Sequence, residues 1–286
     1  MQSILFSKIK LDVQVLTLIL FAGAIFAGLL GSLTGLGGGV IIIPLLTLGL
    51  GFDMRFAVGS ALVTSIATSS GAATAYIREG VTNVRIGMFL EIGTTVGAVV
   101  GAFAAMYLPV NIIMLIYGIV LTFSAVMMVR KKNTDGDCIS PPDPFAVRMK
   151  LNGSFAAKEG IRNYNVHNVV GGFSLMWIAG VLSGILGIGS GALKVLSMDT
   201  MMKIPFKVST TTSNFMVGVT AAASAVIYLQ RGFIDPVLAM PIVPGVLLGA
   251  FIGSKILMKL DTKILKIIFA ILLVFLAIQM IYRGVR

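Results

Sequence analysis

The chain has 286 residues, of which 57% are apolar and 12% are charged, and its mean hydropathy is +1.00. Soluble domains carry about 25% charged residues, so this composition excludes an ordinary soluble fold. The apolar residues form continuous runs of about 20, long enough to cross a bilayer as helices. A transmembrane β-barrel would instead show alternating apolar and polar residues. The sequence therefore predicts an all-α polytopic membrane protein.

The formal net charge is +11, and the basic residues stand mostly at the ends of the apolar segments. This placement is typical of topology signals and of contacts with anionic headgroups, so we expect the lipid bilayer as a partner and no nucleic acid. Cys138 is the only cysteine and His167 the only histidine. They are too few for an internal disulfide or a metal cluster, and we expect no cofactor and no metal site.

Apolar segments on both sides of a polar stretch are predicted to be helices. They cover residues 11–34, 40–50, 55–77, 86–108, 110–129, 169–186, 191–202, 206–229, 233–257 and 262–281. Segment 40–50 would be about 16 Å long at about 1.5 Å per residue, too short for an apolar layer of about 30 Å. Segment 191–202 is similarly short. Each short segment should form a re-entrant hairpin with the helix before it, with the tip inside the membrane.

The two halves of the chain align without a gap at an offset of 152 residues (187 − 35). The glycines stay in register: Gly35, Gly37, Gly39, Gly93, Gly97 and Gly101 match Gly187, Gly189, Gly191, Gly245, Gly249 and Gly253. This register predicts a first transmembrane repeat over 11–130, a linker over 131–168 and a second repeat over 169–283. The four-residue glycine spacing of 93–101 and 245–253 is typical of close helix packing.

The basic residues also predict an orientation. The linker is the most basic loop, so it should be cytoplasmic. The turn at Leu108 and Pro109 carries no Lys or Arg and should lie outside, whereas the matching turn near Leu260 is rich in lysine and should lie inside. The two repeats should therefore be inverted, each with a broken re-entrant hairpin and three transmembrane helices, and both ends of the chain should face outward.

The glycine-rich breaks are the first candidates for function. Breaks at matching places in two halves point to a transporter's binding site. A short helix that starts at membrane depth presents free N–H groups and the positive end of its dipole, which suit an anion. The substrate-binding candidates here are Gly37, Gly38, Gly39, Gly189, Ser190 and Gly191. The alternative is that small residues only permit close helix packing.

Hydroxyl and amide side chains follow each break. They could complete the hydrogen bonds of an oxyanion, and the candidates are Ser60, Thr212, Ser213 and Asn214. The alternative is that these side chains bond the backbone of their own helix or bridge neighbouring helices. For Thr64, Ser65, Ser69 and Ser70 that alternative is the favoured interpretation.

Two charged residues fall inside apolar segments. Lys194 lies three residues into the second short segment, where the first half has Ile42. A charge at membrane depth is expensive, so Lys194 is a candidate for neutralising a bound anion, unless it snorkels to the surface. Glu91, whose counterpart is Val243, could carry a proton, pair with a basic residue, or lie at the interface.

Two glycine motifs carry a resemblance to a known family. The first is Gly28, Gly35-Leu36-Gly37-Gly38-Gly39 and Pro44, followed by Ala57-Val58-Gly59-Ser60; the second is Gly180, Ser183-Gly184 and Gly187-Ile188-Gly189-Ser190-Gly191, followed by Thr212-Ser213-Asn214-Phe215. At these motifs the chain resembles the sulfite exporter TauE/SafE family, also called the 4-toluene sulfonate uptake permease family. The resemblance implies proton-coupled movement of sulfite, thiosulfate or organosulfonates across the bacterial cytoplasmic (inner) membrane. The second half departs from the pattern with Ser190, Lys194 and Leu196.

The expected function is a secondary transporter of small sulfur-containing oxyanions that works by alternating access, with protons as the coupling ion. A passive anion channel and a structural membrane scaffold are the alternatives. The enzyme motifs H-E-x-x-H, G-x-S-x-G and the P-loop do not occur in the sequence, so we expect no enzyme.

Overall fold

The computed structural model describes residues 13–78, 81–130, 143–157, 160–257 and 262–285. Cys138, the turn near Leu260 and the first part of the predicted linker lie outside these ranges. In the first half the structure has α2 (Val13–Thr34), α3 (Gly39–Pro44), the π-helical segment η1 (Leu45–Gly49), α4 (Met54–Arg78), α5 (Val84–Tyr107) and α6 (Val110–Arg130). In the second half it has α8 (Val169–Leu186), α9 (Gly191–Leu196), the π-helical segment η2 (Ser197–Met201), α10 (Phe206–Gln230), α11 (Pro236–Leu257) and α12 (Thr262–Val285).

Six of these helices are long and apolar enough to cross a membrane. They are α2, α4, α5, α8, α10 and α11. The prediction of a mostly helical, multi-pass membrane protein is confirmed at this level.

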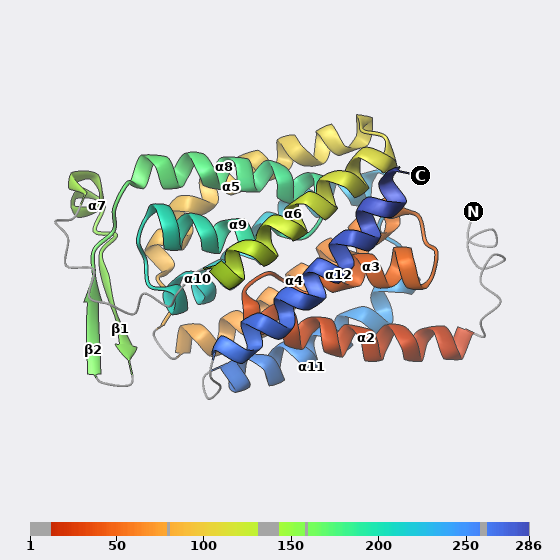
Figure 1. The fold of residues 1–286 in the computed structure, drawn as a ribbon, viewed down its shortest axis with the longest axis horizontal. Helices are drawn as coiled ribbons and strands as arrows, with labels where there is room; N and C mark the ends of the chain where they lie inside the picture. Colours follow the sequence, from red (N-terminus) through yellow and green to blue (C-terminus); the bar gives the residue numbers. More distant parts are fainter. Residues whose placement is uncertain (1–12, 79–80, 131–142, 158–159, 258–261, 286) are drawn as a thin grey trace.

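The boundaries of the elements follow the offset of the sequence alignment. α3 begins at residue 39 and α9 at 191, and the same difference of 152 (191 − 39) separates the starts of η1 and η2, α4 and α10, α5 and α11, and α6 and α12. Two sets of elements therefore succeed one another in the same order. In Figure 1, α2 begins and α12 ends at the same end of the molecule.

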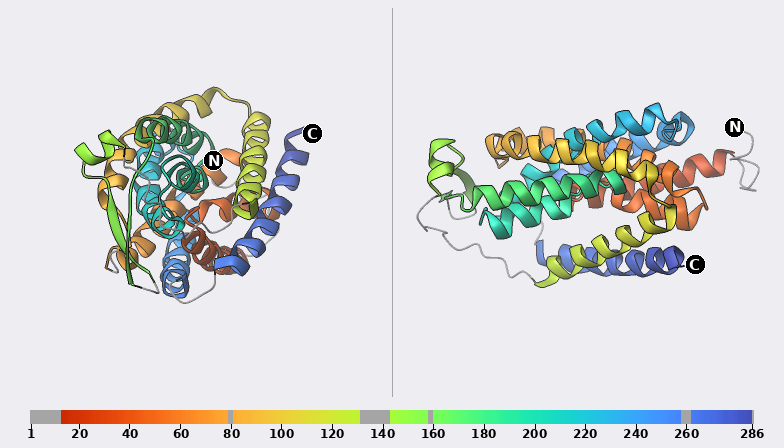
Figure 2. Two further views of the ribbon diagram at one scale, coloured as in Figure 1. Left: turned by 60° about the vertical axis from the view of Figure 1, so that its left-hand side comes forward. Right: turned by 90° about the horizontal axis from the view of Figure 1, so that it is seen from above.

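The helices of the two halves are interleaved. α2 packs against α11, and reciprocally α8, the counterpart of α2, packs against α5, the counterpart of α11. α4 packs against its own counterpart α10, and α6 against α12. The last pair lies along one side of the bundle (Figure 2). Such reciprocal contacts are typical of a two-fold relation, here between halves of one chain.

Glycines bring the interleaved helices into backbone contact. A Cβ atom at Gly97 of α5 would lie 2.3 Å from the carbonyl oxygen of Trp177 in α8. A Cβ atom at Gly249 of α11 would lie 2.0 Å from the carbonyl oxygen of Ile25 in α2. Any larger residue would push the two helices apart. Helix packing is thus the role of these spaced glycines, as their spacing predicts.

The part of the linker that the structure describes is folded, and here the all-α prediction is wrong. It holds the short helix α7 (Pro144–Arg148) and an antiparallel hairpin of β1 (Gly153–Ala157) and β2 (Gly160–Tyr164) at one end of the bundle (Figure 1). Tyr164 accepts a hydrogen bond of 2.7 Å from Asn83 Nδ2 at the start of α5. Burial raises the pKa of the Tyr164 phenol above its ordinary value. Strands of five residues give little periodic signal, so a search for long apolar runs misses them.

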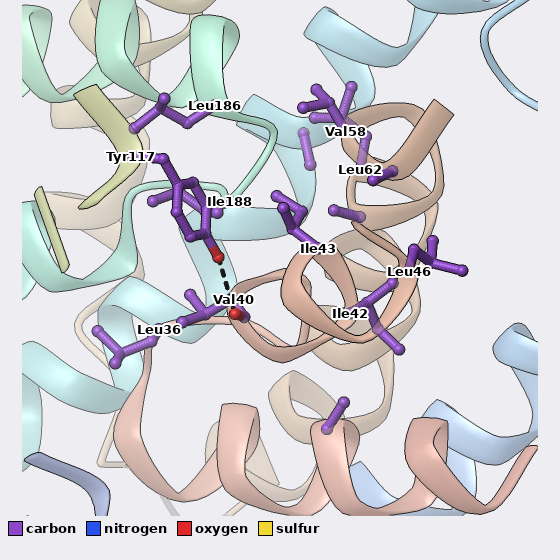
Figure 3. Close-up of a cluster of buried hydrophobic side chains, with 14 of the residues drawn as sticks. Leu36, Val40, Ile42, Ile43, Leu46, Val58, Leu62, Tyr117, Leu186 and Ile188 are labelled. Atoms are coloured by element: carbon purple, nitrogen blue, oxygen red, sulfur yellow. Dashed lines mark hydrogen bonds between the residues drawn. The ribbon is translucent and has the colours of Figure 1, made fainter. Parts of the chain in front are cut away.

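The main core surrounds the first short helix. Val40, Ile42, Ile43 and Leu46 are all buried, and Figure 3 shows them among side chains from several other helices. Tyr117 of α6 donates a hydrogen bond of 2.8 Å to the carbonyl oxygen of Val40 (Figure 3). α3 is therefore enclosed by protein on several sides and anchored by a buried polar contact.

Candidate functional site

Each half has a break where left-handed backbone ends one helix and leads into a short one. In the first break, Gly35 and Gly37 have φ values of +74° and +82°. In the second, Gly187 and Gly189 have values of +69° and +66°, and Ser190 follows at +41°. Glycine adopts this conformation without steric cost, whereas other residues rarely do. The alternating glycines thus permit the sharp change of direction at each break.

The two breaks are in direct contact. A Cβ atom at Gly191 would lie 2.0 Å from the carbonyl oxygen of Gly35 and 2.6 Å from Cα of Leu36. Ser213 Oγ, from α10, lies within hydrogen-bonding distance of the carbonyl oxygens of Gly35 (3.1 Å) and Gly191 (3.2 Å). Segments more than 150 residues apart in the chain (191 − 35 = 156) therefore meet backbone to backbone.

The start of α3 is lined by hydroxyl groups of α4. The N–H of Gly38 donates a hydrogen bond of 3.2 Å to Thr68 Oγ1. A Cβ atom at Gly39 would lie 2.8 Å from Ser65 Oγ. Ser65 is fully buried, and its hydroxyl has no hydrogen-bond partner among the described residues. Leaving a buried polar group unpaired costs about 1–3 kcal/mol of folding free energy. The Ser65 hydroxyl at the first break therefore has unused hydrogen-bonding capacity.

The start of α9 differs from that of α3. Ser190 stands where the first half has Gly38, and its hydroxyl donates to the carbonyl oxygen of Ala179 in α8. Gly189 packs against Val217, the counterpart of Ser65: a Cβ atom there would lie 2.6 Å from Val217 Cγ1. The second break is thus more apolar at this point and uses its serine for a backbone contact.

The predicted side-chain donors are all buried, but they divide into two groups. Thr212 Oγ1 accepts a hydrogen bond from the N–H of Asn83 (3.1 Å), and Ser213 links the two breaks. Asn214 Nδ2 donates to the carbonyl oxygen of Ser32 (2.9 Å). Within the described part of the chain, however, Asn214 Oδ1 and Ser60 Oγ have no partner. Thr212 and Ser213 therefore act on the protein's own backbone, and the other two keep free bonding capacity.

Glu91 and Lys194 form a buried ion pair. Lys194 Nζ lies 3.5 Å from Glu91 Oε2, with side-chain exposures of 0% for the lysine and 9% for the glutamate. Lys194 therefore does not snorkel to the surface, and Glu91 pairs with a basic residue, which was one of its predicted roles. Thr95, one turn further along α5, donates a hydrogen bond of 3.2 Å to Glu91 Oε1.

Thr220 of α10 bridges the ion pair. Its hydroxyl accepts a hydrogen bond from Lys194 Nζ and lies 2.5 Å from Glu91 Oε1, to which it can donate. The counterpart of Thr220 is Thr68, which accepts from the start of α3. The two threonines stand at matching positions of the two halves (220 − 68 = 152). Ser65, which the sequence predicts to bond its own helix or a neighbouring one, is instead unpaired among the described residues.

Residues 20–280 match the family described as Sulfite exporter TauE/SafE. The chain belongs to this family. The TauE/SafE assignment covers both breaks, the ion pair and the folded part of the linker, and it identifies the protein as a membrane transporter. No solved structure matches the chain.

Curated relatives match the TauE/SafE chain over nearly its whole length. The probable membrane transporter protein YunE of Bacillus subtilis is 27% identical over 93% of this chain and 98% of its own. The probable membrane transporter protein YdhB of the same organism is 24% identical over 88% of this chain and 94% of its own. A probable membrane transporter protein of Methanocaldococcus jannaschii is 24% identical over 93% and 96%. The chain thus covers 94–98% of the length of these three relatives.

Proposed function

We propose that this chain is a secondary transporter of small sulfur-containing oxyanions, such as sulfite, thiosulfate or organosulfonates, in the bacterial inner membrane. The observation that carries the proposal is the contact between the two breaks inside the helix bundle. The family description supports a sulfur oxyanion as the class of substrate.

An anion would be held where the short helices begin. The first N–H groups of a helix have no partner within it, and they carry the positive end of the helix dipole. Helices as short as α3 and α9 would be weak sites by themselves. The unpartnered buried hydroxyls of Ser65, at the start of α3, and of Ser60 are independent signs of unused donor capacity. Lys194 would supply positive charge.

Alternating access would come from motion of one half against the other. We infer that the halves are inverted repeats with re-entrant hairpins, and that the linker faces the cytoplasm while α2 begins and α12 ends outside. The reciprocal packing of α2 with α11 and of α8 with α5 supports this inference. A two-fold relation would give the site two equivalent arrangements, one open to each side.

Transport in liposomes tests the proposal. The purified protein would be reconstituted and offered sulfite, thiosulfate, sulfoacetate, methanesulfonate and sulfate. We expect saturable uptake of at least one of these anions, and a response to a pH gradient. An ohmic current without saturation would instead favour a passive anion channel. If no anion is transported and none raises the thermal stability, the protein is a scaffold and the proposal fails.

A further inference from the structure

We propose that Glu91, Thr220 and Lys194 form a switch that makes anion binding depend on protonation of Glu91, with one proton for each singly charged anion. This inference rests on the proposed transport function and narrows its substrate class. Oxyanions with one negative charge should be carried, and dianions should be rejected.

The geometry provides the parts of such a switch. Glu91 Oε2 faces the ammonium group of Lys194 at 3.5 Å and has no hydrogen bond to any described residue. This oxygen is therefore the free position where a proton can bind. Glu91 Oε1, in contrast, lies within hydrogen-bonding distance of Thr95 and Thr220. The hydroxyls hold the carboxyl group in place while its other oxygen changes state.

Among the described residues, the ion-pair partner of Glu91 is Lys194. α8, which packs on α5, contributes Phe173 next to Gly93 and backbone next to Thr94. α10 contributes the Thr220 hydroxyl, and α9 contributes Lys194. Protonation of Glu91 therefore acts on a single partner, the lysine ammonium group.

Counting charges shows why proton and anion must bind together. In the empty state the carboxylate and the ammonium group cancel. If a proton binds to Glu91 and a monovalent anion binds to Lys194, the site is again neutral. Either ligand without the other leaves one net charge in a medium of low polarity, which is costly. Both neutral states are therefore favoured over both charged ones.

The binding cycle is balanced. A proton from solution binds to Glu91 Oε2 and the ion pair opens, while Lys194 stays protonated and takes an oxygen of the anion as its new partner. On the other side of the membrane the anion leaves, the proton dissociates, and the ion pair forms again. Thr220 is a positioning residue, because its hydroxyl contacts both partners of the closed ion pair. Proton and anion move in the same direction, and no net charge crosses the membrane.

The first experiment uses the wild-type protein in liposomes, with methanesulfonate as the monovalent probe and sulfate and thiosulfate as dianions. We expect saturable methanesulfonate uptake driven by a pH gradient and no transport current. The Kd for methanesulfonate should rise with pH, with a limiting slope of about tenfold per pH unit, as one linked proton requires. A current carried by methanesulfonate, a Kd independent of pH, or equal uptake of the dianions would overturn the inference while leaving the transport function in place. Absence of transport for every anion would overturn both.

The second experiment uses Glu91→Gln, whose neutral amide imitates the protonated acid. Counterflow exchange of methanesulfonate should persist, whereas stimulation by a pH gradient should fall at least tenfold and the Kd should lose its pH dependence. Asp235→Asn is the matched control, because this half-buried carboxylate caps the start of α11 through the N–H of Val237 and has no contact with Glu91 or Lys194 among the described interactions. Full stimulation by a pH gradient in Glu91→Gln would contradict the proposal. If Glu91→Gln does not fold, Thr220→Val takes its place and should weaken the dependence of Kd on pH. An unchanged dependence of Kd on pH in Thr220→Val would contradict the proposed switch.

Discussion

The two breaks share a backbone but differ in chemistry. α3 is apolar at Ile42 and is anchored through Val40 to Tyr117. α9 has Lys194 at the matching position and an ion pair to Glu91 in the other half. The comparison teaches that duplication supplies a repeated geometry, while one charged residue in each half, Glu91 and Lys194, places a single buried ion pair in it. The repeated scaffold therefore carries its charge asymmetrically: Glu91 and Lys194 have the apolar counterparts Val243 and Ile42.

The largest effect is expected from Lys194→Met, which makes the second break resemble the first. It leaves Glu91 buried without its partner, and breaking a buried pair in this way costs about 3–5 kcal/mol of folding free energy. Thermal unfolding in detergent should show the loss, and anion-induced stabilisation should disappear.

The matched control gives each position the residue of its counterpart in the other half, as Glu91→Val (from Val243) with Lys194→Ile (from Ile42). This double variant should regain most of the thermal stability but not the anion binding, because no charge is then left unpaired. If the double variant binds methanesulfonate as the wild type does, Lys194 has no part in holding the anion.

An intermediate effect is expected from Gly191→Ala, which tests the contact between the two breaks. The new Cβ atom would lie 2.0 Å from the carbonyl oxygen of Gly35, so the breaks must separate. Overpacking of this kind costs about 1–3 kcal/mol, and transport should be lost. Gly49→Ala is the control, because the nearest atom to its Cβ would be 3.8 Å away. Equal transport by the two variants would show that the contact is dispensable.

The smallest effect on stability is expected from Ser65→Ala. The hydroxyl has no partner among the described residues, so its removal should leave the melting temperature unchanged or slightly higher. The Kd for an anion should rise about tenfold if the hydroxyl donates to it. Ser124→Ala in α6 is the control, since that hydroxyl bonds only its own helix among the described contacts. An unchanged Kd in Ser65→Ala would show that the Ser65 hydroxyl does not bind the anion.

Much of the fold follows from local sequence signals. α8 runs from Val169 to Leu186 as predicted, α4 is one residue longer than predicted at each end, and α10 begins at the predicted Phe206 and ends one residue later than predicted. Long apolar runs and glycine breaks are properties of neighbouring residues, and the repeat is visible when the two halves of the sequence are aligned. All three can therefore be recognised from the sequence. The hairpin of the linker was missed because two five-residue strands carry too few alternations to stand out.

The site was predictable only in part, because its key contacts join distant residues. Glu91 and Lys194 are each noticeable as charges within apolar segments, but they lie 103 positions apart (194 − 91) in different halves. No local pattern predicts that they pair through Thr220. Ser65 was set aside because serine in a helix usually bonds its own backbone, and only the three-dimensional arrangement shows that this one does not.

The interleaved pairing of helices also bears on how the protein is made. α2 lacks its main partner until α11 has been synthesised, because the two are separated by the whole length of the chain between Thr34 and Pro236. During insertion, the glycine faces of α2 and α5 must therefore stay in lipid or against the translocation machinery. Neither half can complete its core alone, yet two halves expressed as separate polypeptides carry all the surfaces needed to find each other in the bilayer.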